Sequence, residues 1–262
     1  MTVIVKIGTS SLADLSGAIK IEAIEKLCSE IAVARENFKR IILVSSGAIG
    51  AGLPALGYVG IRPRDPRVLQ AASAVGQPRL MATYSEIFLK YEIEVAQLLM
   101  APDDFFVRKR YLHAKATIEE LLSAGILPIV NENDAIADDA IRWGDNDRIA
   151  ALLAQLVNAN HLLMLTDTKG IYSRDPKMSN EEESELILQI DSQEDLVAQI
   201  GGSSNAQGSG GMASKLAAAQ MASWAGVTTT IAAATQVNIV IDALQKKTDV
   251  GTTIHPHPKP LS

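Results

Sequence analysis

Apolar and polar positions follow two alternating patterns along this chain. Short apolar runs rich in β-branched residues, such as TVIVKIG (Thr2–Gly8), are typical of strands that are buried on both faces. Longer segments, such as Ile19–Asn37, repeat apolar residues every three or four positions and therefore predict amphipathic helices. Strands are predicted at residues 2–8, 40–46, 94–100, 126–133, 161–167 and 227–233. Helices are predicted at residues 19–37, 65–91 with a kink at Pro78, 108–124, from 147 onward and 212–225.

Alternating strands and helices imply a mostly parallel sheet whose two faces are covered by helices. The 262 residues, 47% of them hydrophobic, are enough to bury the core of one large α/β domain. Two segments depart from the alternation. We interpret Ser184–Ile190, beside the acidic run EEESE, as a hairpin in a surface excursion. We interpret HPHPKP (His255–Pro260) as an exposed, poorly ordered tail.

Composition excludes several classes of protein. The net charge is −6 and the pI about 5.3, and no stretch gathers the Lys and Arg density of a nucleic-acid-binding face, so no nucleic-acid partner is expected. No apolar run reaches the roughly 18 residues of a membrane span, and the N-terminus enters a strand pattern without room for a signal peptide. A soluble cytoplasmic protein with no membrane partner is therefore expected. The single cysteine, Cys28, is interpreted as a small core residue of a helix.

Small and polar residues cluster where the predicted strands end. Each cluster alone is explained by turn formation, since Gly, Ser, Asn and Asp all favour turns. In a parallel sheet, however, ligands bind at the carboxyl ends of the strands, so a shared location at that edge favours a functional site. The clusters are KIGTSS from Lys6, SSGAIGAG at 45–52, NENDAIADD at 131–139, WGDND at 143–147, TDTKGIYSRDP at 166–176 and GSGGMASK at 208–215.

The stretch GSGGMASK (Gly208–Lys215) has two interpretations. It is either a flexible linker or a backbone cradle for a phosphate at a helix N-terminus, with Lys215 in the first turn of that helix. Its fit to a dinucleotide fingerprint is rejected, because that motif directly follows the first strand of a βαβ unit and this one does not. The spacing of a Walker A loop is absent from the chain.

Lys6 favours the phosphate interpretation. A lysine at the end of a central strand is costly to bury without an anion, and together with Lys215 it would supply two cations to one phosphoryl group. Asp147 has two compatible roles, as a first-turn acid of the helix that follows it or as a carboxylate that holds both ammonium groups. No acidic cluster is dense enough for an all-protein metal site, so Mg²⁺ held chiefly by nucleotide phosphates is the economical alternative.

Taken in order, the segments VKIGTSSL, VSSGAIGAG, VNENDA, GDND, MLTDTKGIY and GSGGMASKLAAA resemble the glutamate 5-kinases of the amino acid kinase family. The resemblance covers the chain from Val3 to about Thr253. It implies an αβα sandwich around a mainly parallel sheet, in one kinase domain at 1–255 followed by a short tail at 256–262. Many members carry a C-terminal PUA domain, for which the chain, ending at Ser262, leaves no room, so none is expected.

The same resemblance implies a reaction and its site residues. The γ-phosphoryl group of ATP moves to the γ-carboxylate of L-glutamate in the first step of proline synthesis. The catalytic set is Lys6, Asp147 and Lys215. The glutamate-binding set is Ser46, Asp134 and Asn146. The ATP-binding set is Lys6, Thr166, Asp167, Ser209, Gly210, Gly211, Met212, Ala213, Ser214 and Lys215.

The resemblance also implies Mg²⁺, feedback inhibition by proline and self-association into a dimer or tetramer. Two alternatives stay open. One is a kinase of the same fold that acts on acetylglutamate, aspartate, carbamate or a nucleoside monophosphate, against which the pair NENDA and GDND argues. The other is a non-catalytic nucleotide sensor, which is disfavoured because the catalytic set is complete.

Overall fold

The computed structural model describes residues 1–13, 18–136, 145–173, 184–191, 195, 210–247 and 250–258. The strands are β1 (Thr2–Ile7), β2 (Arg40–Val44), β3 (Val95–Met100), β4 (Leu127–Glu132), β5 (His161–Thr166), β6 (Ile171–Tyr172), β7 (Leu186–Ile187), β8 (Gln189–Ile190), β9 (Thr228–Ala233) and β10 (Thr252–Ile254). The helices are α1 (Thr9–Leu12), α2 (Ile21–Asn37), α3 (Ala48–Gly52), η1 (Leu53–Leu56), α4 (Pro66–Leu89), η2 (Pro102–Phe105), α5 (Arg108–Ser123), α6 (Asp145–Leu156), α8 (Gly210–Trp224) and α9 (Ile239–Leu244).

The strands form one eight-stranded sheet in the order β3-β4-β2-β1-β5-β9-β10-β8 and a two-stranded ribbon of β6 and β7. Every neighbouring pair in the large sheet is parallel except β9 and β10, which are antiparallel. The predicted mainly parallel sheet is therefore confirmed. The six predicted strands and five predicted helices all exist, and α4 is a single helix that contains Pro78.

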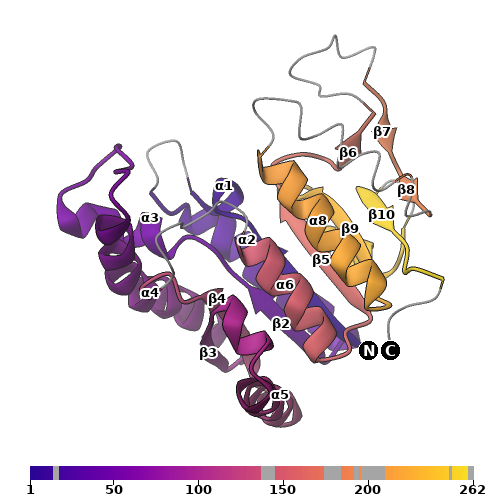
Figure 1. Ribbon diagram of the computed structural model, residues 1–262, viewed down its shortest axis with the longest axis horizontal. Helices are drawn as coiled ribbons and strands as arrows, with labels where there is room; N and C mark the ends of the chain where they lie inside the picture. The colour runs from indigo at the N-terminus through magenta and orange to yellow at the C-terminus, as the bar shows by residue number, and fades with distance from the viewer. Residues whose placement is uncertain are drawn as a thin grey trace.

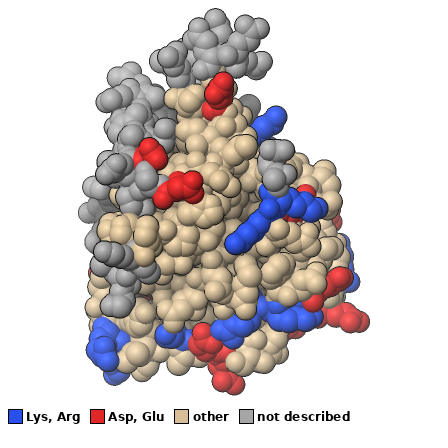
Figure 2. All heavy atoms as spheres, turned by 90° about the vertical axis from the view of Figure 1, so that its right-hand side faces the viewer, with Lys and Arg blue, Asp and Glu red and all other residues tan. Residues whose placement is uncertain are grey.

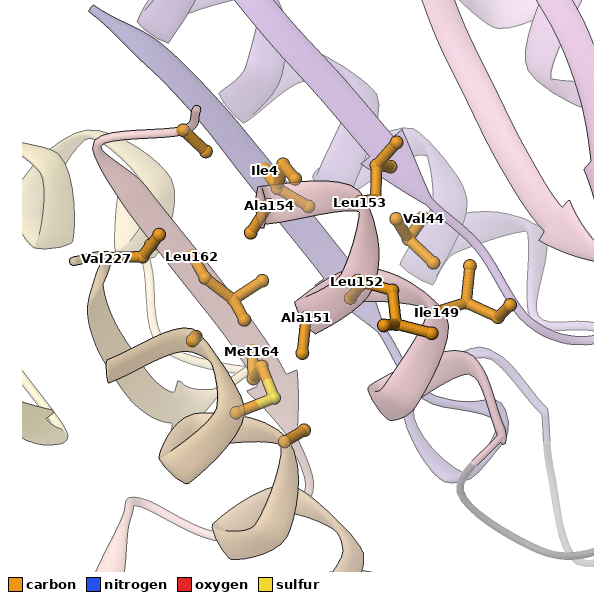
Figure 3. Close-up of a cluster of buried hydrophobic side chains, with 14 of the residues drawn as sticks. Ile4, Val44, Ile149, Ala151, Leu152, Leu153, Ala154, Leu162, Met164 and Val227 are labelled. Atoms are coloured by element: carbon orange, nitrogen blue, oxygen red, sulfur yellow. The ribbon is translucent and has the colours of Figure 1, made fainter. Parts of the chain in front are cut away.

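Helices cover both faces of the sheet, as the prediction of an αβα sandwich requires (Figure 1). Successive side chains of a strand point to opposite faces, and β1 shows this directly. Val3 and Val5 belong to the core under α2, α4 and α9, where Cys28 is also buried. Ile4 belongs to the core under α5, α6 and α8. Figure 3 shows how α6 lays its apolar side chains, Leu153 among them, over this second core. No helix within the described ranges is long and apolar enough to cross a membrane.

The predicted hairpin at 184–190 is wrong. Its two strands do not pair with each other: β7 pairs with β6, and β8 joins the edge of the large sheet beside β10. A buried hydroxyl explains the arrangement, because Thr252 Oγ1 donates to the carbonyl of Ile187 (2.5 Å) and accepts from the amide of Ile171 (2.8 Å). Strands of two residues are too short to carry a periodic pattern, so these distant contacts decide their pairing.

The predicted exposed tail is also wrong over its described part. The ring of His257 stacks on Trp224 at the end of α8, with centroids 3.8 Å apart. The amide of His257 donates to the carbonyl of Ser223 (3.0 Å), and Ser223 Oγ donates to the carbonyl of His255 (3.0 Å). Residues 259–262 lie outside the described part of the chain. An aromatic contact at the end of a helix therefore orders a segment whose composition suggests a loose end.

Two glycines let α3 lie directly on α4. A Cβ atom at Gly52 would stand 1.8 Å from the carbonyl oxygen of Ala72, and one at Gly76 would stand 1.8 Å from that of Ala48. No side chain fits at either position without separating the two helices. The contact fixes the segment that follows β2, and with it Ser46, against the sequence-distant helix α4.

His161 makes the stability of the fold depend on pH. It is 2% exposed, Nε2 lies 3.0 Å from Thr230 Oγ1, and burial, with a smaller effect of the charge of Lys246, lowers its pKa from 6.5 to about 4. Between these values the unfolded chain binds a proton that the folded chain does not, so stability falls as the pH falls. The expected loss from pH 7 to pH 4 is about 3 kcal/mol.

The test is urea unfolding of the wild type and of His161→Gln at several pH values. The variant lacks the titrating ring, so the difference between the two free energies of unfolding should change by about 3 kcal/mol across this range. A difference that stays constant with pH would show that His161 is not kept neutral by folding.

Candidate active site

The carboxyl ends of β1, β2, β4 and β5 meet at one edge of the sheet. These four strands are parallel neighbours, with Lys6 paired to Val44 on one side and to Met164 on the other. The polar clusters that follow the strands are therefore brought together, as the sequence predicts. On the face shown in Figure 2, Lys and Arg side chains are interspersed with Asp and Glu side chains among the described residues.

Lys6, Asp147 and Lys215 form a buried charged cluster, which we call the charge triad. Lys6 has the parity of Ile4 in β1, so its side chain lies on the face that α6 and α8 cover. Its Nζ forms an ion pair with Asp147 Oδ1, and Lys215 Nζ lies 3.3 Å from Asp147 Oδ2. The three residues are 3%, 1% and 8% exposed. Folding thus joins one strand and two helices through a single carboxylate.

The triad carries more positive than negative charge. Burial lowers the pKa of Lys6, and the nearby ammonium of Lys215 adds to this effect, while Asp147 opposes it. Burial alone would raise the pKa of Asp147, but the charges of Lys6 and Lys215 together hold that pKa below its usual value. Asp147 is therefore ionised at neutral pH, and the triad sets two basic side chains against one carboxylate. Buried excess charge of this kind is costly unless a ligand compensates it.

The N-terminus of α8 differs from the prediction. The helix begins at Gly210 and not at Met212, so both glycines belong to its first turn and Lys215 to its second. The free backbone N–H groups of the first turn are those that a phosphate would use. Lys215 Nζ also donates to the carbonyl of Gly211 (3.2 Å), and Ser214 Oγ donates to Asp147 Oδ2 (2.5 Å). Ser209 and Gly208 lie outside the described residues.

Asn146 and Asp147 are neighbours in the first turn of α6 but serve different sides of the site. Asn146 Oδ1 accepts from the amide of Glu132 (3.1 Å), and its Nδ2 donates to Ser46 Oγ (3.1 Å). The structure thus brings together two predicted glutamate-binding residues. The third, Asp134, follows β4 and accepts from Ser73 Oγ in α4 (3.3 Å). One turn of helix therefore separates a polar half of the site from the charge triad.

Two of the predicted ATP-binding residues lie at the carboxyl end of β5, next to β1. Thr166 is buried and its Oγ1 donates to Asp167 Oδ1 (3.0 Å), while Asp167 is exposed. The carbonyl of Thr166 accepts from the amide of Ala234, which follows β9. Met212 and Ala213 lie in the first turn of α8, where Met212 packs against the core beside α6. Thr166 and Asp167 thus end the strand beside β1, which carries Lys6, and Met212 and Ala213 lie in the helix that carries Lys215.

Sequence reasoning missed the polar residues of α4 that support this site. Gln77 Oε1 accepts from Asn131 Nδ2 (2.8 Å), and Tyr84 OH lies 2.8 Å from Ser45 Oγ. The helical spacing of the polar residues in this segment could have revealed them. Ser73, Gln77 and Tyr84 lie on the same helical stripe as the buried Leu80, so polar side chains interrupt a stripe that faces the core.

The described side chains of the site offer few free ligands for a metal ion. Within the described residues, no three His, Cys, Asp or Glu side chains are grouped so that they could hold a metal ion. Asp147, the buried carboxylate of the charge triad, is already paired with two ammonium groups. A divalent cation in this part of the site would need oxygen ligands from elsewhere, and ligand phosphates are of the kind that Mg²⁺ prefers.

Comparisons with known proteins point in one direction. Residues 1–232 match the model of the amino acid kinase family. A glutamate 5-kinase of Cyanothece sp. is 40% identical over 263 residues, which span 100% of this chain and 71% of the relative. A glutamate 5-kinase of Nocardia farcinica is 41% identical over 261 residues, which span 100% of this chain and 69% of the relative.

Solved structures share the fold at lower sequence identity. Carbamate kinase from Giardia lamblia bound to AMP-PNP has a TM-score of 0.68 at 17% identity and covers 98% of both chains. UMP kinase from Ureaplasma parvum has a TM-score of 0.65 at 15% identity and covers 97% of this chain and 98% of its own. The predicted fold class is thereby confirmed. On the match over residues 1–232 and the identity to relatives along its whole length, this chain belongs to the amino acid kinase family.

Proposed function

We propose that this protein is an ATP-dependent kinase that transfers the γ-phosphoryl group of ATP to the γ-carboxylate of L-glutamate, as its curated relatives are named to do. The observation that carries the proposal is the buried charge triad with its net positive charge, at the sheet edge where ligands bind. A phosphoryl group in transfer is the kind of anion that such a site stabilises, because negative charge spreads over its equatorial oxygens.

The two halves of the site divide the substrates between them. The first turn of α8 and the end of β5 take the nucleotide, with Lys6 and Lys215 directed at the transferring group. Ser46, Asp134 and Asn146 take the amino acid, with Asp134 suited to its ammonium group and Asn146 to its carboxylate. The γ-carboxylate of glutamate is already ionised at pH 7, so the attack needs no general base. Catalysis then consists of alignment and charge neutralisation between two anionic reactants.

The remaining parts of the proposal rest on the resemblance to this family. They are Mg²⁺ bound through the nucleotide phosphates, feedback inhibition by proline, self-association and a cytoplasmic location. The absence of a protein-only metal cluster within the described residues is compatible with Mg²⁺ bound in this way.

The test is an acceptor panel. ADP release is measured with ATP, Mg²⁺ and one acceptor at a time: L-glutamate, N-acetylglutamate, L-aspartate, carbamate or UMP. We expect release to depend on L-glutamate and the acyl phosphate to be trapped by hydroxylamine as a hydroxamate. A clear preference for another acceptor would refute the proposed substrate and leave the family assignment intact. If ATP binds normally but no acceptor supports ADP release, the result would favour a nucleotide sensor.

A further inference from the structure

A chain of three amides, two of them buried, runs from helix α4 to the polar half of the site. Gln77 Oε1 accepts from Asn131 Nδ2 (2.8 Å), and Asn131 Oδ1 accepts from Asn146 Nδ2 (2.9 Å). Asn146 Nδ2 in turn donates to Ser46 Oγ (3.1 Å). Gln77 is 5% exposed and Asn131 is 1% exposed, so water does not compete for the bond between them. We call Gln77, Asn131 and Asn146 the amide relay.

One backbone group fixes the direction of the relay. The amide N–H of Glu132 can only donate, and it lies 2.9 Å from Asn131 Oδ1 and 3.1 Å from Asn146 Oδ1. Both side-chain oxygens must therefore face it. If the amide of Asn146 were reversed, its NH₂ group would face that N–H and its oxygen would face Asn131 Oδ1. The NH₂ group of Asn131 is consequently left facing α4, where it needs an acceptor.

Gln77 supplies that hydrogen-bond acceptor from α4, a helix that contains none of the predicted site residues. A buried amide donor without a partner is costly, and a side chain that lacks its partner adopts other orientations. Without a hydrogen-bond acceptor at position 77, Asn131 would no longer be held in one orientation. A mobile Asn131 would no longer hold Asn146 against Ser46. The loss of order would reach the polar half of the site, which we assign to the phosphoryl acceptor. It would not reach the charge triad, because none of the hydrogen bonds of the relay described above involves a side chain of the triad.

We propose that Gln77 is a positioning residue for the phosphoryl acceptor: it holds Asn131 in the orientation that the backbone amide of Glu132 selects, and Asn131 in turn holds Asn146 toward the substrate. The inference rests on the proposed function for the identity of the acceptor, L-glutamate. It adds a residue that neither the sequence motifs nor the predicted site residues include. The inference predicts that the affinity for the phosphoryl acceptor depends on Gln77, whereas the affinity for ATP does not.

The test compares Gln77→Met with Gln77→Glu. Methionine keeps the approximate size of the side chain and removes its hydrogen-bond acceptor. The KM for L-glutamate should therefore rise by about tenfold or more, while the KM for ATP should change by less than about twofold. Glutamate at position 77 keeps an oxygen in the same place and should restore the KM for L-glutamate to within about threefold of the wild type. Ile87→Val, a buried change in the same helix away from the relay, controls for a general loss of stability.

Several outcomes would overturn the inference. A parallel rise of both KM values in Gln77→Met, an unchanged KM for glutamate, or no recovery in Gln77→Glu would each do so. If Gln77→Met does not fold, Gln77→Asn, which keeps an amide but shortens its reach, replaces it. If the wild type prefers another acceptor, the proposed function fails, and the same KM comparison with that acceptor tests the relay independently.

Discussion

Replacing Lys215 by methionine is expected to lower kcat by about 10²–10³-fold at saturating ATP and glutamate. The ammonium of Lys215 is buried beside Asp147, in the charge triad that we assign to the transferring phosphoryl group. Methionine keeps much of the side-chain volume and removes the charge. The loss should fall mainly on kcat, because the interaction strengthens as the phosphoryl group leaves ADP.

The same variant should remain folded, which separates a catalytic from a structural role. Without Lys215, Asp147 still pairs with Lys6, and the repulsion between the two ammonium groups disappears. The Tm of Lys215→Met should therefore equal or exceed that of the wild type, and ATP should still bind in calorimetry. Lys247→Met, which removes an exposed lysine paired with Asp242, is the matched control and should leave kcat unchanged. A kcat near the wild-type value in Lys215→Met would remove this residue from the mechanism.

Replacing Asp147 by asparagine should produce the largest loss of stability of any single change in the site. The substitution leaves two buried ammonium groups without a counter-charge, and breaking a buried pair in this way typically costs about 3–5 kcal/mol. For a chain of this length, that corresponds to a fall in Tm on the order of 10 °C. Asp242→Asn, at an exposed pair, should change stability by less than about 1 kcal/mol.

An anion should rescue Asp147→Asn. Phosphate or ATP places negative charge between Lys6 and Lys215, so either should raise the Tm of the variant more than that of the wild type. Lys215→Met in the Asp147→Asn background should also recover stability, because it removes one of the two unpaired cations. A variant as stable as the wild type, or one that phosphate does not stabilise further, would show that the triad does not hold uncompensated positive charge.

The long helices and strands and most of the site could be predicted from the sequence. Both follow from residue periodicity and from the order of elements along the chain. The parity of β1 places Lys6 on the face of Ile4, and a parallel sheet then brings the ends of β1, β2, β4 and β5 to one edge. The resemblance assigned the neighbours Asn146 and Asp147 within GDND to glutamate binding and to catalysis, but it did not show the contacts that separate their roles. Only the structure shows that neighbouring residues on one helical turn face the two halves of the site.

What the sequence did not predict depends on contacts between distant residues. The hydrogen bonds of Thr252 hold β6 and β7 beside β10, and β8 pairs with β10. The described tail is held by the contact of His257 with Trp224. The spacing in α4 places Gln77 on a buried stripe, but its partner Asn131 is identified only by the structure. Such pairings carry no period along the chain, so periodicity cannot find them.

The insertion of β10 between β9 and β8 has a consequence for how the protein is made. Among the described strands, β8 pairs with the large sheet through β10, whose residues 252–254 leave the ribosome much later than residues 189–190. Until they do, the outer side of β9 is an open edge with unpaired backbone groups, available to a second nascent chain. Chaperones that shield exposed strands would therefore have most effect on yield before β10 docks beside β9.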